Sequence, residues 1–131
     1  MMRMLAAGAA LFSVCSFAGD FYAGPAWGKN CPGQKVRVDQ YNMFLSTTAK
    51  CDIPVVNAEH MRAMYMKYPK IEFYGCWGKL LNGNFVLLHR DGKTETYPQE
   101  VFALVRASKN DDGVVLSSAA YDRGLSKCPQ P

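Results

Sequence analysis

The sequence lacks the residue patterns that mark most small enzymes. It contains two histidines, His60 and His89, and no H-x-x-x-H or H-E-x-x-H pair, so it has no zinc-hydrolase ligand set. No two cysteines form a C-x-x-C pair, and no serine lies in a G-x-S-x-G turn. No glycine-rich phosphate loop follows a strand-like run. We therefore find no catalytic motif and expect no metal or cofactor.

Long apolar runs and blocks of like charge are also missing. The 131 residues include 15 basic and 11 acidic residues, which gives a net charge of +4. The basic residues are scattered, unlike those of a nucleic-acid-binding surface. No stretch approaches the roughly 18 consecutive apolar residues of a transmembrane helix. We expect neither a nucleic-acid partner nor a transmembrane segment.

The first 18 residues are typical of a secretory signal peptide. Arg3 supplies the positive charge, residues 4–14 the apolar run, and a Ser-Phe-Ala tripeptide ending at Ala18 the small-x-small cleavage site. We expect cleavage after Ala18 and a periplasmic or secreted protein. A lipoprotein would instead be acylated at Cys15, but Val14 replaces the small residue usual before such a cysteine.

Four cysteines remain once the signal peptide is removed. An even number in a small exported chain indicates two disulfides, because the compartment is oxidising and the core is small. Zinc is the competing use, but these cysteines are widely separated in the sequence. Four cysteines allow three pairings, and their positions alone leave the choice open. The four are Cys31, Cys51, Cys76 and Cys128.

The clearest strand pattern runs from Ile71 to Phe102. Asn82-Gly83-Asn84 and Asp91-Gly92 separate three strand-like runs, and both are turn signals. We predict a three-stranded antiparallel meander that is tied to an earlier segment through Cys76. Trp77 points to the opposite face of its strand and is a predicted core residue.

Residues Asn57 to Tyr68 have the pattern of an amphipathic helix. Asn57 is a good N-cap and Pro69 would end the helix. One apolar stripe has the i, i+3, i+4, i+7 spacing of a helix face: Met61, Met64, Tyr65 and Tyr68. A soft-metal site on these methionines is the alternative, but methionines at this spacing are more often core residues.

Together these patterns predict an α+β fold, with a small antiparallel β-meander of about four to six strands, one packed amphipathic helix and two disulfides. The domain is expected to span residues 35–120. Residues 121–131 would form a C-terminal tail, and residues 19–34 an irregular arm rich in aromatic residues, glycine and proline. Tyr22 and Trp27 of this arm either pack on the domain or form an exposed contact surface.

The cysteines and the meander also resemble a known pattern. The chain has a strand ending near Cys51, a Gly75-Cys76-Trp77 strand, a strand leading to Asp91-Gly92, and then Tyr97-Pro98 before Phe102. These features resemble a loose, uncharacterised family of small exported bacterial proteins, some of them prophage-associated. The resemblance implies a Cys51–Cys76 disulfide, which leaves Cys31–Cys128 to join the two ends. This chain departs from the family pattern in its second cysteine pair, its longer predicted helix and its C-terminal segment.

Export, a disulfide-stabilised fold and the lack of a catalytic motif favour a binding or interaction module. Its partner would be an envelope protein, a secreted protein or a cell-wall component. One alternative is a small cell-wall hydrolase that uses a pair of carboxylates, and another is an envelope accessory protein of a mobile element. The candidate carboxylates are Glu59, Glu72, Asp91, Glu95 and Glu100.

Chemical reduction should therefore destabilise the protein strongly. Each disulfide is expected to stabilise the fold by roughly 3–5 kcal/mol, with the longer loop contributing more. Thermal melting with and without reductant measures the loss, and an unchanged curve with free thiols would contradict it. Peptide mapping without reduction tests the pairing, which a Cys31–Cys51 peptide would refute.

Overall fold

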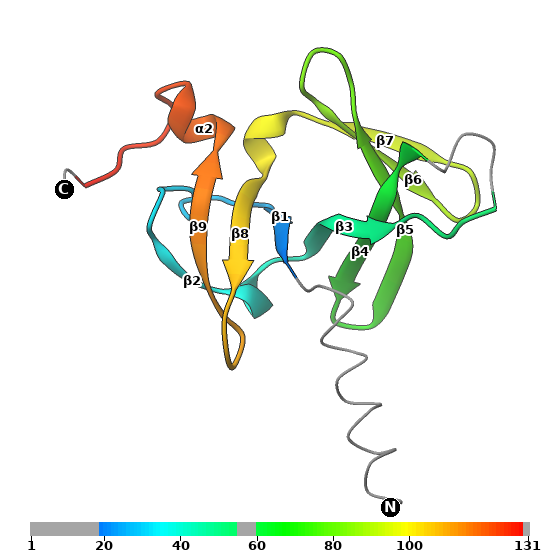
Figure 1. The fold of residues 1–131 in the computed structure, drawn as a ribbon, viewed down its shortest axis with the longest axis horizontal. Helices are drawn as coiled ribbons and strands as arrows, with labels where there is room; N and C mark the ends of the chain where they lie inside the picture. The colour runs from blue at the N-terminus through cyan, green and yellow to red at the C-terminus, as the bar shows by residue number, and fades with distance from the viewer. Residues whose placement is uncertain (1–18, 55–59, 130–131) are drawn as a thin grey trace, which may run out of the picture.

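A computed structural model describes residues 19–54 and 60–129. The expected signal peptide and the first residues of the predicted helix lie outside these ranges. The described residues form one nine-stranded antiparallel sheet with the order β2-β9-β8-β1-β3-β4-β5-β6-β7 (Figure 1). Its strands are β1 (Asp20–Gly24), β2 (Lys35–Arg37), β3 (Met43–Lys50), β4 (Arg62–Tyr68), β5 (Ile71–Lys79), β6 (Phe85–His89), β7 (Thr94–Tyr97), β8 (Ala103–Ala107) and β9 (Asp112–Ser118). Short helical turns are η1 (Val38–Gln40), η3 (Gln99–Val101) and α2 (Ala119–Asp122).

The α+β class predicted from the sequence is wrong, because most of the described part of the predicted helix is a strand and a nine-stranded sheet dominates the fold. Residues 62–68 form β4, which lies between β3 and β5. Met64 and Met66 are two residues apart, share one face of the strand and are both buried. The apolar pattern therefore also fits the period of two that a strand has. Pairing with β3 and β5 on its two sides outweighs the local helix signals. Among the described residues, no helix is long and apolar enough to cross a membrane.

The segment expected to be an irregular arm instead supplies a central strand. β1 pairs with β3 on one side and with β8 on the other. Phe21 and Ala23 are buried, and they alternate with Tyr22 in a strand only five residues long. An alternation of buried and partly buried residues this short is hard to recognise in a sequence rich in glycine and proline. The sheet therefore begins at residue 20 rather than 35.

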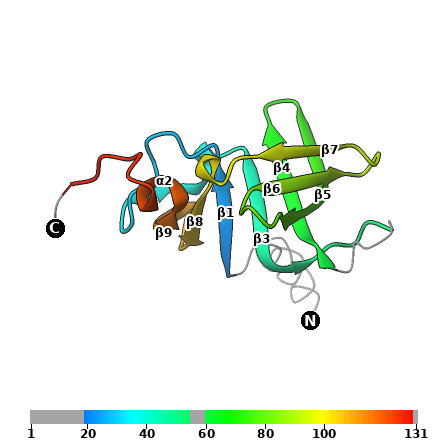
Figure 2. The ribbon, with the colours of Figure 1, turned by 90° about the horizontal axis from the view of Figure 1, so that it is seen from above.

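Both faces of the central strands are buried, each in its own cluster. Side chains alternate between faces along a strand, so neighbours in β1 and β3 enter different clusters. The first cluster contains Phe21, Ala23, Ala26, Val36, Tyr41, Phe44, Ala103, Val105 and Val115. The second contains Met43, Leu45, Met64, Met66, Trp77, Phe85, Leu87 and Phe102. The sheet twists strongly around the second cluster, so that β6 and β7 run across the direction of β1 and β4 (Figure 2).

The meander predicted over Ile71–Phe102 is confirmed. β5 pairs with β6, and β6 pairs with β7, which is an edge strand of the sheet. Gly83 and Gly92 lie in the two turns with φ of 91° and 92°, a conformation that favours glycine. After the meander, β8 and β9 pair as an antiparallel hairpin.

Two disulfides are present, in the pairing that the resemblance implies. Cys51 and Cys76, with Cα atoms 5.3 Å apart, join the end of β3 to the middle of β5. Cys31 and Cys128, with Cα atoms 5.7 Å apart, join the loop after β1 to the C-terminal tail. Such bridges suit the oxidising compartment expected for an exported protein. Trp77 is buried as predicted, and its indole Nε1 donates a hydrogen bond to the carbonyl oxygen of Ser46 at 2.8 Å.

Two glycines of β5 give a matched test of this packing. A Cβ atom at Gly75 would meet the carbonyl group of Leu88 and lie 2.6 Å from Cε of Met64, whereas one at Gly78 would have no neighbour closer than 3.8 Å. We expect Gly75→Ala to lower the free energy of unfolding by about 1–3 kcal/mol, because the core is overpacked. Gly78→Ala should change it by less than about 1 kcal/mol. Urea unfolding measures both, and equal effects would contradict this packing.

Candidate functional site

Strand β5 extends beyond the end of its neighbour β6. It has nine residues and β6 has five. β5 pairs with β4 from Ile71 to Trp77, but its pairing with β6 begins only at Gly75, opposite His89. Residues Ile71–Tyr74 therefore have β4 on one side and, among the described residues, no strand in register on the other. We call this four-residue stretch the β5 overhang.

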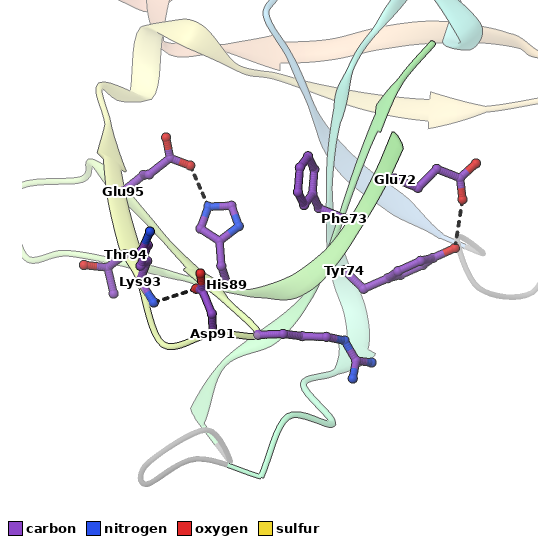
Figure 3. A pocket seen from close by; sticks show the side chains of 9 residues that line it. Glu72, Phe73, Tyr74, His89, Asp91, Lys93, Thr94 and Glu95 are labelled. Carbon is purple, nitrogen blue, oxygen red and sulfur yellow. Dashed lines mark hydrogen bonds and ion pairs between the residues drawn. The ribbon is translucent and has the colours of Figure 1, made fainter. Parts of the chain in front are cut away.

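A groove of about 590 Å³ lies beside the overhang (Figure 3). The overhang forms one wall, and the end of β6, the turn that follows it and the start of β7 form the other. The lining residues are Glu72, Phe73, Tyr74, His89, Arg90, Asp91, Lys93, Thr94 and Glu95. Three carboxylates, two cationic side chains and three rings thus share one open groove.

We call the wall formed by β6 and β7 the inner wall of the groove. Hydrogen bonds there link His89, Glu95 and Tyr97. His89 Nε2 lies 2.6 Å from Glu95 Oε1, and the Tyr97 hydroxyl donates to Glu95 Oε2 at 3.3 Å. Burial raises the pKa of Tyr97, and the hydrogen bond and charge of Glu95 raise it further. The Phe73 ring lies edge-on to the imidazole, with ring centroids 6.2 Å apart. The pair with Glu95 therefore fixes the orientation of His89.

The outer face of the overhang has a second carboxylate with aromatic neighbours. Tyr74 Oη donates a hydrogen bond to Glu72 Oε1 at 3.3 Å. The Tyr65 ring packs between Tyr74 and Phe44, with centroids 5.1 and 5.8 Å away. Burial is the largest cause that raises the pKa of Tyr65 to about 12, and the hydrogen bond and charge of Glu72 add to it. Glu72 thus organises the aromatic side chains behind the groove.

The tip of the β4–β5 hairpin exposes four large side chains. Tyr68 is 37% exposed, Ile71 53%, Phe73 38% and Tyr74 53%. Tyr68 and Phe73 are in edge-to-face contact, with centroids 6.2 Å apart. Several exposed apolar groups on one hairpin are typical of a contact surface, whereas singly exposed ones are normal. This cluster borders the groove.

The two residues proposed from the sequence as surface contacts lie elsewhere. Tyr22 packs on the second cluster, 5.5 Å from the Trp77 ring and 5.0 Å from the Phe85 ring, with Lys79 Nζ 5.4 Å from its own centroid. Trp27 is 72% exposed, in the loop after β1. The sequence patterns did not predict the overhang. The only available signal was that the run before Asn82 is longer than the run after Asn84.

Three of the five candidate carboxylates come together at the groove. They are Glu72, Asp91 and Glu95. Glu100 lies outside it and forms an ion pair with Arg123 at 2.5 Å, and Glu59 lies outside the described residues. Glu72 and Glu95 already accept hydrogen bonds from tyrosines, which orders their carboxylates. Within residues 19–54 and 60–129, no cluster of three or more His, Cys, Asp or Glu side chains could hold a metal ion.

Comparison with known proteins found no matching family model, no matching curated protein and no matching solved structure. The resemblance to exported, prophage-associated proteins stays a prediction.

Two tyrosines test the electrostatics of the site. The pKa of Tyr41 is also raised to about 12, but by burial alone. Glu72→Gln should lower the pKa of Tyr65, because a nearby negative charge disfavours the phenolate, and should leave that of Tyr41 unchanged. Both raised values stabilise the protonated native state, so the stability they contribute is present below pH 10 and lost between about pH 10 and 12.

NMR titration of ring-labelled tyrosine measures both groups in one sample. An equal shift of both tyrosines, or no shift of either, would contradict the role of Glu72.

Proposed function

We propose that this protein is an exported, disulfide-stabilised binding module that holds a protein partner of the cell envelope or the extracellular space. The β5 overhang and its groove form the binding site. The observation that carries the proposal is the exposure of Phe73 and Tyr74 along one wall of the groove, with Ile71 exposed beside them. Aromatic side chains are enriched among the residues that dominate protein interfaces.

The rigidity of the hairpin supports this assignment. The overhang pairs with β4 along its whole length, and Cys76, two residues beyond it, is bonded to Cys51. A surface that is already ordered loses little conformational entropy when a partner binds. The exposed rings are thus held in a binding-ready arrangement.

A carboxylate-dependent hydrolase is less well supported. Such an enzyme needs one carboxyl group to give a proton and another to act on water or substrate. In the groove, Glu95 accepts from Tyr97 and lies against His89, and Glu72 accepts from Tyr74. These contacts support ordered walls of a binding groove, so binding is the function we propose.

Substituting the exposed apolar residues should remove binding without unfolding the protein. We expect Ile71→Ser combined with Phe73→Ser to weaken partner capture at least tenfold, which corresponds to about 1.4 kcal/mol. Leu81→Ser is the matched control, because Leu81 is fully exposed at the opposite end of β5, in the turn to β6. The measurement is quantitative capture of envelope and secreted proteins on the immobilised protein.

Melting curves must show that all variants fold. Equal capture by the double variant and by Leu81→Ser would contradict the assignment of the site. Absence of any specific capture by the unaltered protein would contradict the binding function itself.

A further inference from the structure

We propose that the partner binds by adding a β-strand to the overhang. An extended segment of the partner would lie in the groove, in line with β6, and pair with the backbone of β5 at Glu72 and Tyr74. Its side chains would alternate between apolar and basic. The inference rests on the proposed binding function and names the chemistry of the partner.

The direction of the backbone groups follows from the sheet register. The His89 N–H donates to the Lys93 carbonyl at 2.8 Å, so the backbone of His89 faces β7 rather than β5. Backbone groups alternate sides along an antiparallel strand, and Gly75, the partner of His89, therefore faces β4. By the same alternation, the backbone groups of Glu72 and Tyr74 face the groove.

The position of the groove fits a strand rather than a compact ligand. It continues the line of β6 past Gly75 and His89, where the registered pairing of β5 with β6 ends. The four residues of the overhang span about 13 Å at roughly 3.3 Å per residue, which matches a strand segment of similar length. Edge backbone groups of this kind are a ready template for another chain.

The walls of the groove select the side chains of the added strand. Phe73 and His89 lie on the inner face, so alternate residues of the partner that point there should be apolar. A residue directly opposite Glu72 would point to the outer face, where opposite charges stabilise a cross-strand pair. Lys67 already faces Glu72 from the β4 side. Among the described residues, no strand pairs with Glu72 on the groove side.

The charge of the groove also favours basic residues in the partner. Glu72, Asp91 and Glu95 outnumber the two cations, Arg90 and Lys93, although the whole chain has a net charge of +4. Glu95 lies on the inner face and already contacts His89 and Tyr97, so Glu72 is the carboxylate that a basic residue of the added strand would face. The groove is therefore locally acidic on a basic protein. An alternating apolar and basic segment matches both the side-chain faces and this charge.

The other edge near the groove is less suited to strand addition. β7 is an edge strand of the same length as the overhang, but the side chains of Thr94, Glu95 and Thr96 along it are polar and exposed. Polar and charged side chains protect an edge against pairing, whereas the overhang carries the exposed side chains of Ile71, Phe73 and Tyr74. We therefore place the added strand on β5.

Two substitutions at one position separate backbone pairing from side-chain contact. Glu72→Pro removes the N–H that faces the groove, and it should leave the β4 ladder intact because the ladder bonds use the neighbouring residues. Glu72→Ala removes the carboxylate and keeps the N–H. We expect Glu72→Ala to weaken binding two- to fivefold and Glu72→Pro to weaken it at least tenfold more.

The probe is the peptide acetyl-Lys-Val-Lys-Val-Lys-Val-amide, followed by fluorescence anisotropy with the oxidised, full-length protein. One control peptide is N-methylated at its lysines, whose amides would face β5, and another at its valines, whose amides would face away. The first should lose binding at least tenfold and the second should keep it. These peptides test the pairing even if Glu72→Pro does not fold. Amide exchange at Glu72 should slow at least tenfold in the complex.

Equal affinities of the two N-methylated peptides, no protection at Glu72, or no binding of the unmodified peptide would each overturn strand addition. A dimer in sedimentation experiments that Glu72→Pro abolishes would overturn it in favour of a second copy of this chain. Glu72→Pro could still capture the partner while the Ile71 and Phe73 substitutions abolish capture. That result would refute strand addition alone. The binding function would then still hold.

Discussion

The pairing of β1 with strands on both of its sides holds the sheet together. β8, β9 and β2 lie on one side of β1, and β3 to β7 on the other. Its register with β8 places Phe21 beside Val105, and its register with β3 places Tyr22 beside Leu45. These contacts belong to different clusters on opposite faces. One short strand therefore couples both hydrophobic cores. The groove lies in the half of the sheet formed by β3 to β7, which β1 joins to the other half.

The parts of the fold that local chemistry determines could be predicted from the sequence. Asp91-Gly92 and Asn82-Gly83 need backbone conformations that glycine provides, and they define the meander without knowledge of anything distant. The polar run before Tyr97 has the alternating charges and threonines typical of an edge strand, and β7 lies at an edge of the sheet. The disulfide pairing is also present, although the residues alone left three choices and only the resemblance selected one.

Elements whose conformation is decided by distant partners could not be predicted. Residues 57–68 have the cap and stripe signals of a helix, but residues 62–68 pair with β3 and β5 and form a strand between them. β1 has too few residues for its alternation to stand out beside glycine and proline. The overhang could not be predicted either, because its free edge depends on where β6 ends. A strand edge stays free only where the neighbouring strand stops, and that depends on register rather than on composition.

The position of β1 also constrains when the protein can fold. It is the first strand of the sheet to leave the ribosome or a translocation channel, yet its neighbour β8 lies near the other end of the chain. The Cys31–Cys128 bridge spans 97 residues and likewise needs the last part of the chain. Contacts between such distant segments form slowly, because a long loop must close before they gain any stabilisation. The two halves of the sheet can join only after nearly the whole chain has emerged, and until then Phe21 and Ala23 need protection from premature association.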